Sequence, residues 1–254
     1  MAFFDGSIYS PALGMMTSLA VSLPEDGIKD KSGSGVPVVY LLHGLSDNHS
    51  AWFRRTNVEY YAELANAAIV MPEVQRSFYT DMAHGTKYFT YIAEDLPRIC
   101  RNMFHISDRK EDTYIAGLSM GGYGALKTAL RYPERFNAVA SFSGAVNIHS
   151  RLLSDTPSIS REECIGINDG VIRPEDDLYL LAEQAAKKGC PRVYMSCGLS
   201  DFLYEDNKNF REHLNKCGIP FVYEEWQGYH DWEFWEKSIK SAMHYFFKGN
   251  PLFS

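Results

Sequence analysis

Cysteine is scarce in this sequence, and long hydrophobic runs are missing. The five cysteines among 254 residues are widely spaced and form no Cys-x-x-Cys or Cys-x-x-His pattern. Neither a disulfide framework nor a structural zinc site is therefore expected. The thiols are predicted to be reduced, as in cytoplasmic proteins. No stretch is long enough to span a membrane.

The apolar stretch from residue 13 to 23 is hydrophobic enough for a signal-peptide core, but the other features of such a peptide are lacking. No lysine or arginine precedes Lys29, and Pro24, Glu25 and Asp26 follow in place of a small-residue cleavage site. We therefore expect a strand here and a cytoplasmic protein.

An excess of basic residues is also lacking. Lysine and arginine number 25 against 32 aspartates and glutamates, a formal charge of −7, and no basic run exceeds two residues. An acidic chain repels the phosphates of nucleic acids, so nucleic-acid binding is not expected. The hydrophobic fraction of 45% excludes intrinsic disorder. At this length we expect one domain over residues 1–254, with a core that needs no cross-links.

Short apolar runs alternate with segments of helical periodicity along the chain. This alternation predicts an α/β fold, with a mostly parallel central sheet covered by helices on both faces and antiparallel strands near the N-terminus. A polar segment near 145–175 breaks the pattern, and is either a small insertion over an active site or a long surface connection. The predicted strands are 15–23, 36–42, 68–71, 113–116, 138–142, 192–197 and 221–226, and the predicted helices are 58–68, 88–104, 121–132, 176–188, 206–216 and 232–247.

A Gly-x-Ser-x-Gly motif, Gly117 to Gly121, lies between a predicted strand and a predicted helix. This is the context of a nucleophile elbow, in which a sharp turn exposes a serine hydroxyl at the carboxyl edge of the sheet. The motif alone also occurs by chance as a glycine-rich turn. Its position between strand and helix favours Ser119 as a nucleophile.

A serine hydroxyl needs a base, and in α/β hydrolases an acid and then a histidine follow the serine. Only His230 and His244 come late enough in the chain. His244 falls inside the closing helix, whereas His230 lies in the loop between the last strand and the last helix, where a base can reach the sheet edge. We predict that His230 is the base. Asp231 is interpreted as the cap of the final helix.

The acid is expected directly after the preceding strand, where Asp201 follows Gly198-Leu-Ser. Asp201 is predicted to accept the second imidazole N–H and to fix the tautomer of the base. The alternative is a helix-capping role. Glu205 and Asp206 are weaker candidates for the acid.

Two backbone N–H groups are expected to stabilise the oxyanion formed during attack on an ester. One is that of Met120, the residue after the nucleophile, and the other is that of Leu45, in the loop after the strand at 36–42. Gly44 would permit a close backbone approach. His43 precedes this glycine in a turn, so a structural role is favoured over a role as base.

Taken together, these motifs resemble the esterase D family of α/β hydrolases, and within it the bacterial tributyrin esterases. The likeness covers nearly the whole chain, with the motifs in family order. One departure is Asp47, where the tributyrin branch more usually has a small residue. The motifs are Leu42-His-Gly-Leu45 followed by Trp52, Gly117-Leu-Ser-Met-Gly-Gly122, Ser141-Phe-Ser-Gly144, Gly198-Leu-Ser-Asp201 and Gly228-Tyr-His-Asp-Trp232.

The resemblance implies hydrolysis of short-chain acyl esters through a serine acyl-enzyme, without a metal or an organic cofactor. Family substrates include small glycerides, acetylated sugars and hydroxycinnamoyl esters of plant cell-wall sugars. The partner expected is thus a small-molecule ester, with no nucleic acid or membrane, and a homo-oligomer is left open. Four aromatic residues are expected to bind substrate or, alternatively, to belong to the core: Trp52, Tyr79, Tyr88 and Trp232.

Other members of the family leave alternatives open. An S-formylglutathione hydrolase would need a pocket for the γ-glutamyl carboxylate of glutathione, and no basic cluster singles one out. A mycolyl-type acyltransferase would pass the acyl group to an alcohol or sugar instead of water. A binding protein on an inactive hydrolase fold is disfavoured by the complete set of Ser119, Asp201 and His230.

Overall fold

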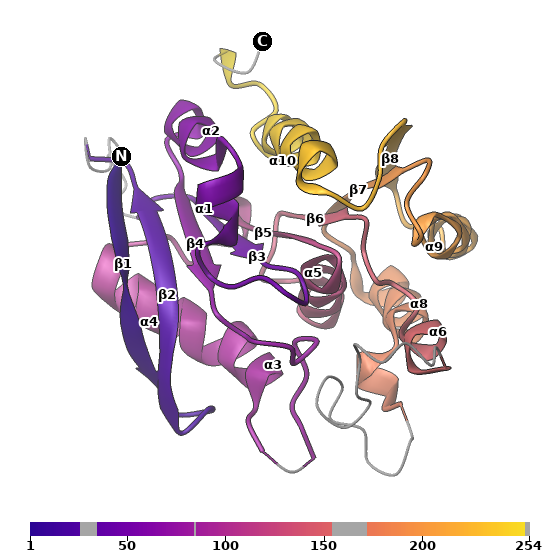
Figure 1. Cartoon of the computed structure of the whole chain (residues 1–254), viewed down its shortest axis with the longest axis horizontal. Coiled ribbons are helices and arrows are strands. Elements are labelled where there is room, and N and C mark those ends of the chain that lie inside the picture. Colours follow the sequence, from indigo (N-terminus) through magenta and orange to yellow (C-terminus); the bar gives the residue numbers. More distant parts are fainter. Residues whose placement is uncertain (26–34, 84, 154–171, 252–254) are drawn as a thin grey trace.

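A computed structural model describes residues 1–25, 35–83, 85–153 and 172–251 (Figure 1). Its centre is an eight-stranded sheet of order β1-β2-β4-β3-β5-β6-β7-β8. The strands are β1 (Ala2–Ser10), β2 (Met15–Leu23), β3 (Val38–Leu42), β4 (Ala68–Pro72), β5 (Thr113–Leu118), β6 (Ala138–Phe142), β7 (Arg192–Gly198) and β8 (Phe221–Trp226).

The sheet is parallel from β4 to β8, while β1 and β2 pair antiparallel with each other and β2 pairs antiparallel with β4. The predicted α/β class with antiparallel N-terminal strands is therefore confirmed. Strand β1 was not expected, because most of its side chains are exposed and give no buried alternation.

Helices cover both faces of this sheet, as predicted (Figure 1). On one face lie α1 (Ala51–Arg55), α2 (Val58–Ala65) and α10 (Trp232–Phe246). On the other lie α4 (Leu96–Phe104), α5 (Met120–Arg131), α8 (Leu178–Lys188) and α9 (Tyr204–Lys216). The predicted helix at 88–104 consists of α3 (Tyr88–Thr90), a π-helical turn at Tyr91–Asp95 and α4.

Strand β3 shows why the apolar runs are continuous instead of alternating. Val38, Tyr40 and Leu42 pack into the core on the face of α4 and α5, whereas Val39 and Leu41 pack into the core on the face of α2 and α10. Successive side chains of a strand point to opposite faces, and both faces of this sheet are covered. Every residue of β3 is consequently buried.

The polar segment near 145–175 is described only at its two ends. It begins with α6 (Ile148–Leu153) and ends in a 3₁₀ turn at Pro174–Asp176. The residues between, 154–171, lie outside the described part of the chain. Whether the segment covers the active site therefore stays a prediction.

A buried ion pair fastens the end of this segment to α5, the helix that follows Ser119. The Lys127 ammonium lies 2.5 Å from the Asp176 carboxylate, and the lysine is fully buried. It also donates to the backbone oxygen of Tyr79 and to the Thr80 hydroxyl. Burial lowers the pKa of Lys127 to about 8, an effect that the attraction of Asp176 opposes. Asp176 also pairs with Arg173, at 2.8 Å.

Removing the buried carboxylate should destabilise the protein. We expect Asp176→Asn to lower the free energy of unfolding by about 3–5 kcal/mol, because it leaves Lys127 without its counter-ion in the core. The double variant Lys127→Met/Asp176→Asn should recover part of this loss. The matched control is Asp108→Asn, which breaks the half-exposed Arg101 pair and should cost under about 1 kcal/mol. Equal denaturation midpoints for the wild type and Asp176→Asn would contradict this expectation.

Candidate active site

Ser119 lies in the sharp turn between the end of β5 and the start of α5, with φ 51° and ψ −115°. A positive φ is unfavourable for a residue with a Cβ and marks backbone strain. The turn survives because it is held on both sides: the Ser119 N–H donates to Phe142 O, and the Ser119 carbonyl accepts from Tyr123 and Ala145. The predicted strand–turn–helix context of the serine is present.

The two glycines of the motif are required by close backbone approaches. A Cβ added to Gly117 would collide with the backbone of Gly121, and one added to Gly121 would collide with the carbonyl of Leu42. The elbow is therefore packed backbone to backbone against the end of β3. This packing brings the loop after β3 beside Ser119.

The structure brings Ser119, His230 and Asp201 together from three separate loops. The Ser119 hydroxyl lies 3.0 Å from His230 Nε2, and His230 Nδ1 lies 2.9 Å from one Asp201 oxygen and 3.1 Å from the other. The loops that carry Asp201 and His230 are joined through their backbones, since Ser200 N donates to Gly228 O. This is the arrangement of a nucleophile, a base and a residue that orients the base.

The Asp201 carboxylate is buried, with 5% of the residue exposed. Burial alone would raise its pKa, but hydrogen bonds from His230 and from the Leu203 N–H hold the pKa below the usual range. Asp201 is thus an anion that can only accept at His230 Nδ1, which leaves Nε2 free to accept the serine proton. The helix that follows begins at Tyr204, with Leu203 in the capping position.

The neighbouring residues have the roles expected of them. Asp231 caps α10, accepting from the Phe234 N–H at 3.0 Å, and His244 lies exposed within that helix. The His230 ring is packed between Phe202 and the edge of Trp235, at centroid distances of 4.5 and 5.0 Å. The ring is therefore held by both hydrogen bonds and apolar contacts.

The loop after β3 lies against the nucleophile. A Cβ added to Gly44 would be 3.8 Å from the Ser119 Cβ. Met120 is the first residue of α5, so its N–H has no partner inside the helix. Within the described residues, the Leu45 N–H donates to no other group. The loop that carries Leu45 is thus beside the serine, and the Met120 N–H lies at the start of α5 directly after it.

Asp47, the departure from the tributyrin esterases, faces the backbone of this loop. Its Oδ2 accepts the Gly44 N–H at 3.2 Å, and its own N–H donates to the Gly44 carbonyl at 3.2 Å. The carboxylate therefore contributes to the shape of the loop that carries Leu45.

Three of the four predicted substrate-binding aromatics belong to the core instead. Trp52, Tyr79 and Tyr88 are at most 2% exposed. The indole N–H of Trp52 donates to Leu42 O, and the Tyr79 hydroxyl donates to His43 O. Their surfaces are used in packing, so the expectation of substrate contact is corrected for these three. Trp232 is half-buried, with the edges of Trp52 and Trp235 against it.

An exposed apolar rim beside the base was not predicted from the sequence. Leu199, Phe202 and Tyr229 are 46%, 69% and 62% exposed, and the Phe202 ring contacts His230. Large apolar side chains left in water near a reactive group often mark a ligand-binding surface. The sequence feature that could have identified these residues is their position, since each of the three lies within two residues of Asp201 or His230.

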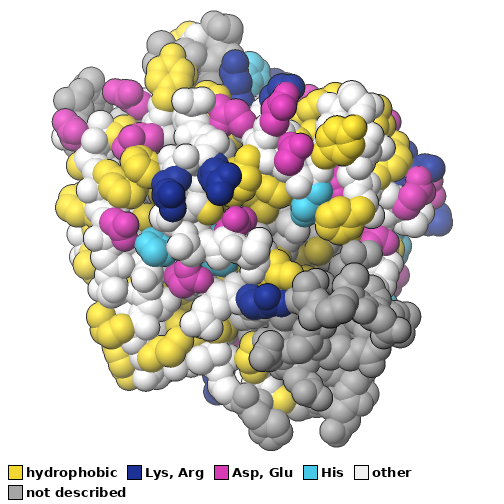
Figure 2. Space-filling model, viewed as in Figure 1, with side chains coloured by type: hydrophobic (Ala, Val, Ile, Leu, Met, Phe, Trp, Pro, Cys, Tyr) yellow, Lys and Arg dark blue, Asp and Glu magenta, His cyan; other side chains and the backbone are white. Residues whose placement is uncertain are grey.

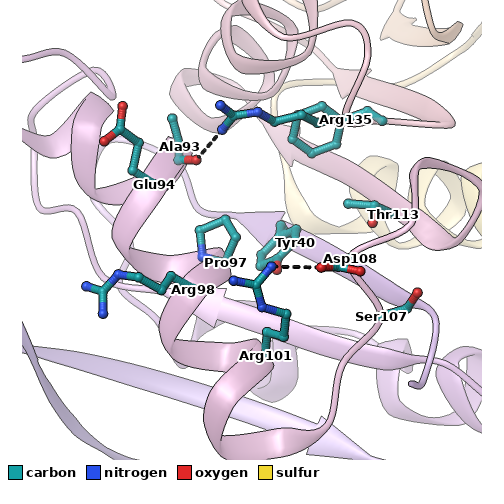
Figure 3. A pocket seen from close by; sticks show the side chains of 11 residues that line it. Tyr40, Ala93, Glu94, Pro97, Arg98, Arg101, Ser107, Asp108, Thr113 and Arg135 are labelled. Carbon is teal, nitrogen blue, oxygen red and sulfur yellow. Dashed lines mark hydrogen bonds and ion pairs between the residues drawn. The ribbon is translucent and has the colours of Figure 1, made fainter. Parts of the chain in front are cut away.

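A cavity of about 480 Å³ elsewhere contains none of these residues (Figure 3). It lies near the amino ends of the parallel strands, with Thr113 of β5 and Tyr40 of β3 in its wall. Arg101 and Asp108, two of the residues that line it, form an ion pair of 2.8 Å. The cavity is thus at the opposite edge of the sheet from Ser119.

The described residues contain no group of three or more histidines, cysteines, aspartates or glutamates that could hold a metal ion. None of their helices is both long and apolar enough to cross a membrane. Four cysteines of this part of the chain are free thiols, and Cys164 lies outside it. On the face drawn in Figure 2, basic and acidic side chains are interspersed.

The Esterase family model matches residues 10–246 of this chain. The chain belongs to the esterase family. An acetyl esterase from Caldicellulosiruptor saccharolyticus is 31% identical over 98% of this chain and 99% of its own length. The predicted resemblance is therefore confirmed at the level of the family, and the protein is a carboxylic ester hydrolase.

Solved structures agree with this esterase assignment. The substrate-bound structure of FphF, a fluorophosphonate-binding serine hydrolase of Staphylococcus aureus, is 32% identical with a TM-score of 0.90, covering 97% of this chain and 98% of that one. An S-formylglutathione hydrolase of the same organism is also 32% identical, with a TM-score of 0.87 over 97% and 99% of the two chains. Both support the α/β-hydrolase fold.

Proposed function

We propose that this esterase hydrolyses acetyl and other short-chain acyl esters through an acyl-enzyme on Ser119. The observation that carries the proposal is the continuous hydrogen-bonded series from the Ser119 hydroxyl through His230 to the buried Asp201. A serine hydroxyl is a weak nucleophile until a positioned base removes its proton. The geometry supplies that base and holds it in the required tautomer.

In this mechanism His230 Nε2 takes the hydroxyl proton as Ser119 Oγ attacks the ester carbonyl carbon. The N–H groups of Leu45 and Met120 stabilise the resulting oxyanion. His230 then gives the proton to the departing alkoxide, the C–O bond breaks and the alcohol leaves. Water repeats the sequence on the acyl-enzyme, with His230 as base, and releases the carboxylic acid and free Ser119.

Small acyl groups are supported by the acetyl esterase relative, whose likeness spans nearly both chains. The exposed rim of Leu199, Phe202 and Tyr229 offers an apolar and aromatic surface for the alcohol or for a larger acyl group. Aromatic faces stack on planar rings. Acetylated or hydroxycinnamoylated saccharides and small glycerides are therefore the substrate classes proposed.

The second candidate is hydrolysis of S-formylglutathione. It is favoured by the 32% identical S-formylglutathione hydrolase structure and by a relative of that name from Paracoccus denitrificans, 27% identical over 53% of this chain. Both reactions use the same attack on an acyl carbon. They differ in the leaving group, a thiolate of glutathione in one case and an alkoxide in the other.

We expect p-nitrophenyl acetate to give a rapid burst of p-nitrophenol followed by slower turnover, because acylation with this good leaving group should outpace deacylation. Stopped-flow absorbance, with enzyme concentration varied, measures the burst amplitude. One mole per mole of active sites is expected, and p-nitrophenyl butyrate should show the same amplitude. No burst together with no turnover would contradict the proposal. A kcat/KM for S-formylglutathione far above that for acetyl esters would favour the second candidate.

The remaining parts of the proposal concern organisation and partners. We propose a single domain over residues 1–254, located in the cytoplasm, that acts on a small-molecule ester without nucleic acid or membrane. Acyl transfer is separated from hydrolysis by adding an alcohol or sugar acceptor, since transfer would divert product from the free acid to a new ester.

A further inference from the structure

The peptide between Gly44 and Leu45 is held in place from several sides, and His43 makes the shortest of these contacts. His43 Nδ1 lies 2.7 Å from the carbonyl oxygen of Gly44, and the side chain is buried, with the residue 1% exposed. A carbonyl oxygen can only accept a hydrogen bond. Nδ1 must therefore carry a proton and donate it to this oxygen.

The other ring nitrogen indicates the same tautomer. The Val74 N–H donates to His43 Nε2 at 3.1 Å, which requires a lone pair on Nε2. Glu73 Oε1 lies farther from Nε2, at 3.4 Å. The Glu73 carboxylate accepts the N–H groups of Gln75 and His49 instead. Nδ1 must carry the proton that it donates to the Gly44 carbonyl, whether Nε2 faces the Val74 N–H or the Glu73 carboxylate.

The backbone of His43 is fixed as well. Its carbonyl accepts from the hydroxyl of the buried Tyr79 at 2.9 Å. On the far side of Gly44, the Asp47 carboxylate accepts the Gly44 N–H. The His43 ring is thus attached to a fixed backbone, and the peptide that it contacts lies in a short loop that cannot rotate freely.

We propose that His43 is a positioning residue for the oxyanion hole, acting through an Nδ1–H to Gly44 carbonyl hydrogen bond that aims the Leu45 N–H. The reason is the planarity of the peptide unit. The carbonyl of Gly44 and the N–H of Leu45 belong to one planar trans peptide and point in opposite directions. Fixing the oxygen on one side fixes the donor on the other. This inference rests on the proposed function, because it assigns Leu45 N–H to the oxyanion.

Two isosteric variants distinguish the contribution of Nδ1 from that of Nε2. In His43→Asn the side-chain amide lies where Nδ1 was and can still donate to Gly44. In His43→Gln the amide reaches the position of Nε2, and the donor to Gly44 is lost. We expect His43→Gln to lower kcat by about 10²-fold with KM unchanged, as for loss of one oxyanion donor. His43→Asn should stay within a few-fold of the wild type. Both measurements use p-nitrophenyl acetate.

A purely structural role for His43 would affect both variants alike, or KM and stability together. Equal kcat values for His43→Gln and His43→Asn would therefore overturn the proposal, as would a loss confined to KM. Melting temperatures of both variants, compared with the wild type, separate loss of fold from loss of rate.

A measurement on the wild-type protein does not depend on either variant folding. ¹⁵N-labelled histidine spectra, assigned by the disappearance of one signal in His43→Asn or, failing that, by contacts of the ring with Tyr79 and Val74, report which nitrogen of His43 is protonated. We expect a proton on Nδ1. A ring protonated on Nε2 alone would overturn the proposal. Because this readout needs no activity, it stands apart from the fate of Ser119 as nucleophile.

Discussion

Replacing Ser119 with alanine is expected to lower kcat/KM for p-nitrophenyl acetate by roughly 10⁴- to 10⁶-fold. The variant keeps the fold of the elbow but has no oxygen to form the acyl-enzyme. The residual rate should come from the oxyanion donors and substrate binding alone. Stopped-flow absorbance should show no burst, and a fluorophosphonate probe should label the wild type but not the variant.

The matched control for this experiment is Ser200→Ala. Ser200 is an exposed serine on the loop that carries Asp201, and its hydroxyl accepts from Gln227 instead of facing His230. Its rate should remain within a few-fold of the wild type. Full activity in Ser119→Ala would show that another group is the nucleophile and would remove the proposed mechanism.

Replacing Asp201 with asparagine is expected to lower kcat by about 10⁴-fold while the protein remains folded. The carboxylate can only accept at His230 Nδ1, whereas an asparagine amide can also donate there. Donation to Nδ1 would put the ring proton on Nε2, the nitrogen that must receive the serine proton. The loss should therefore appear in acylation, measured as the burst rate constant, and not in the melting temperature alone.

Asp231→Asn is the control for Asp201→Asn, because Asp231 is adjacent to His230 but caps α10. Asparagine is also a good N-cap, so both stability and rate should be nearly unchanged. If both variants lost activity equally, the loss would have to come from a general disturbance of the loop. Wild-type activity in Asp201→Asn would assign the orienting role to another residue.

Local chemistry in the sequence was enough to find the three residues that meet at the sheet edge. Ser119 was marked by glycines that the elbow packing requires, and His230 and Asp201 by their positions after the last two strands. Parallel strands place their carboxyl ends at one edge, so residues far apart in the chain could be expected to meet. The capping role of Asp231 followed from its place before a helix.

Other features of the protein could not be predicted from sequence patterns. Trp52, Tyr79 and Tyr88 were expected either to contact substrate or to belong to the core, because an aromatic residue has the same appearance in a sequence whether it lines a pocket or fills a core. Phe202 and Tyr229 are exposed beside His230, and only the packing of two loops decides that. Strand β1 is mainly exposed and so carries no buried pattern.

The sequence by itself determined the α/β class, the alternation of the buried parallel strands with helices, the class of reaction and the candidate residues Ser119, Asp201 and His230. The tertiary structure decided which side chains face the substrate, that Lys127 and Asp176 form an ion pair in the core, and that the His43 ring holds the Gly44 carbonyl. The physical reason is the distance along the chain over which each effect acts. Strand and helix periodicity and turn chemistry act over a few residues, whereas burial and hydrogen-bond partners depend on segments brought together by the whole fold.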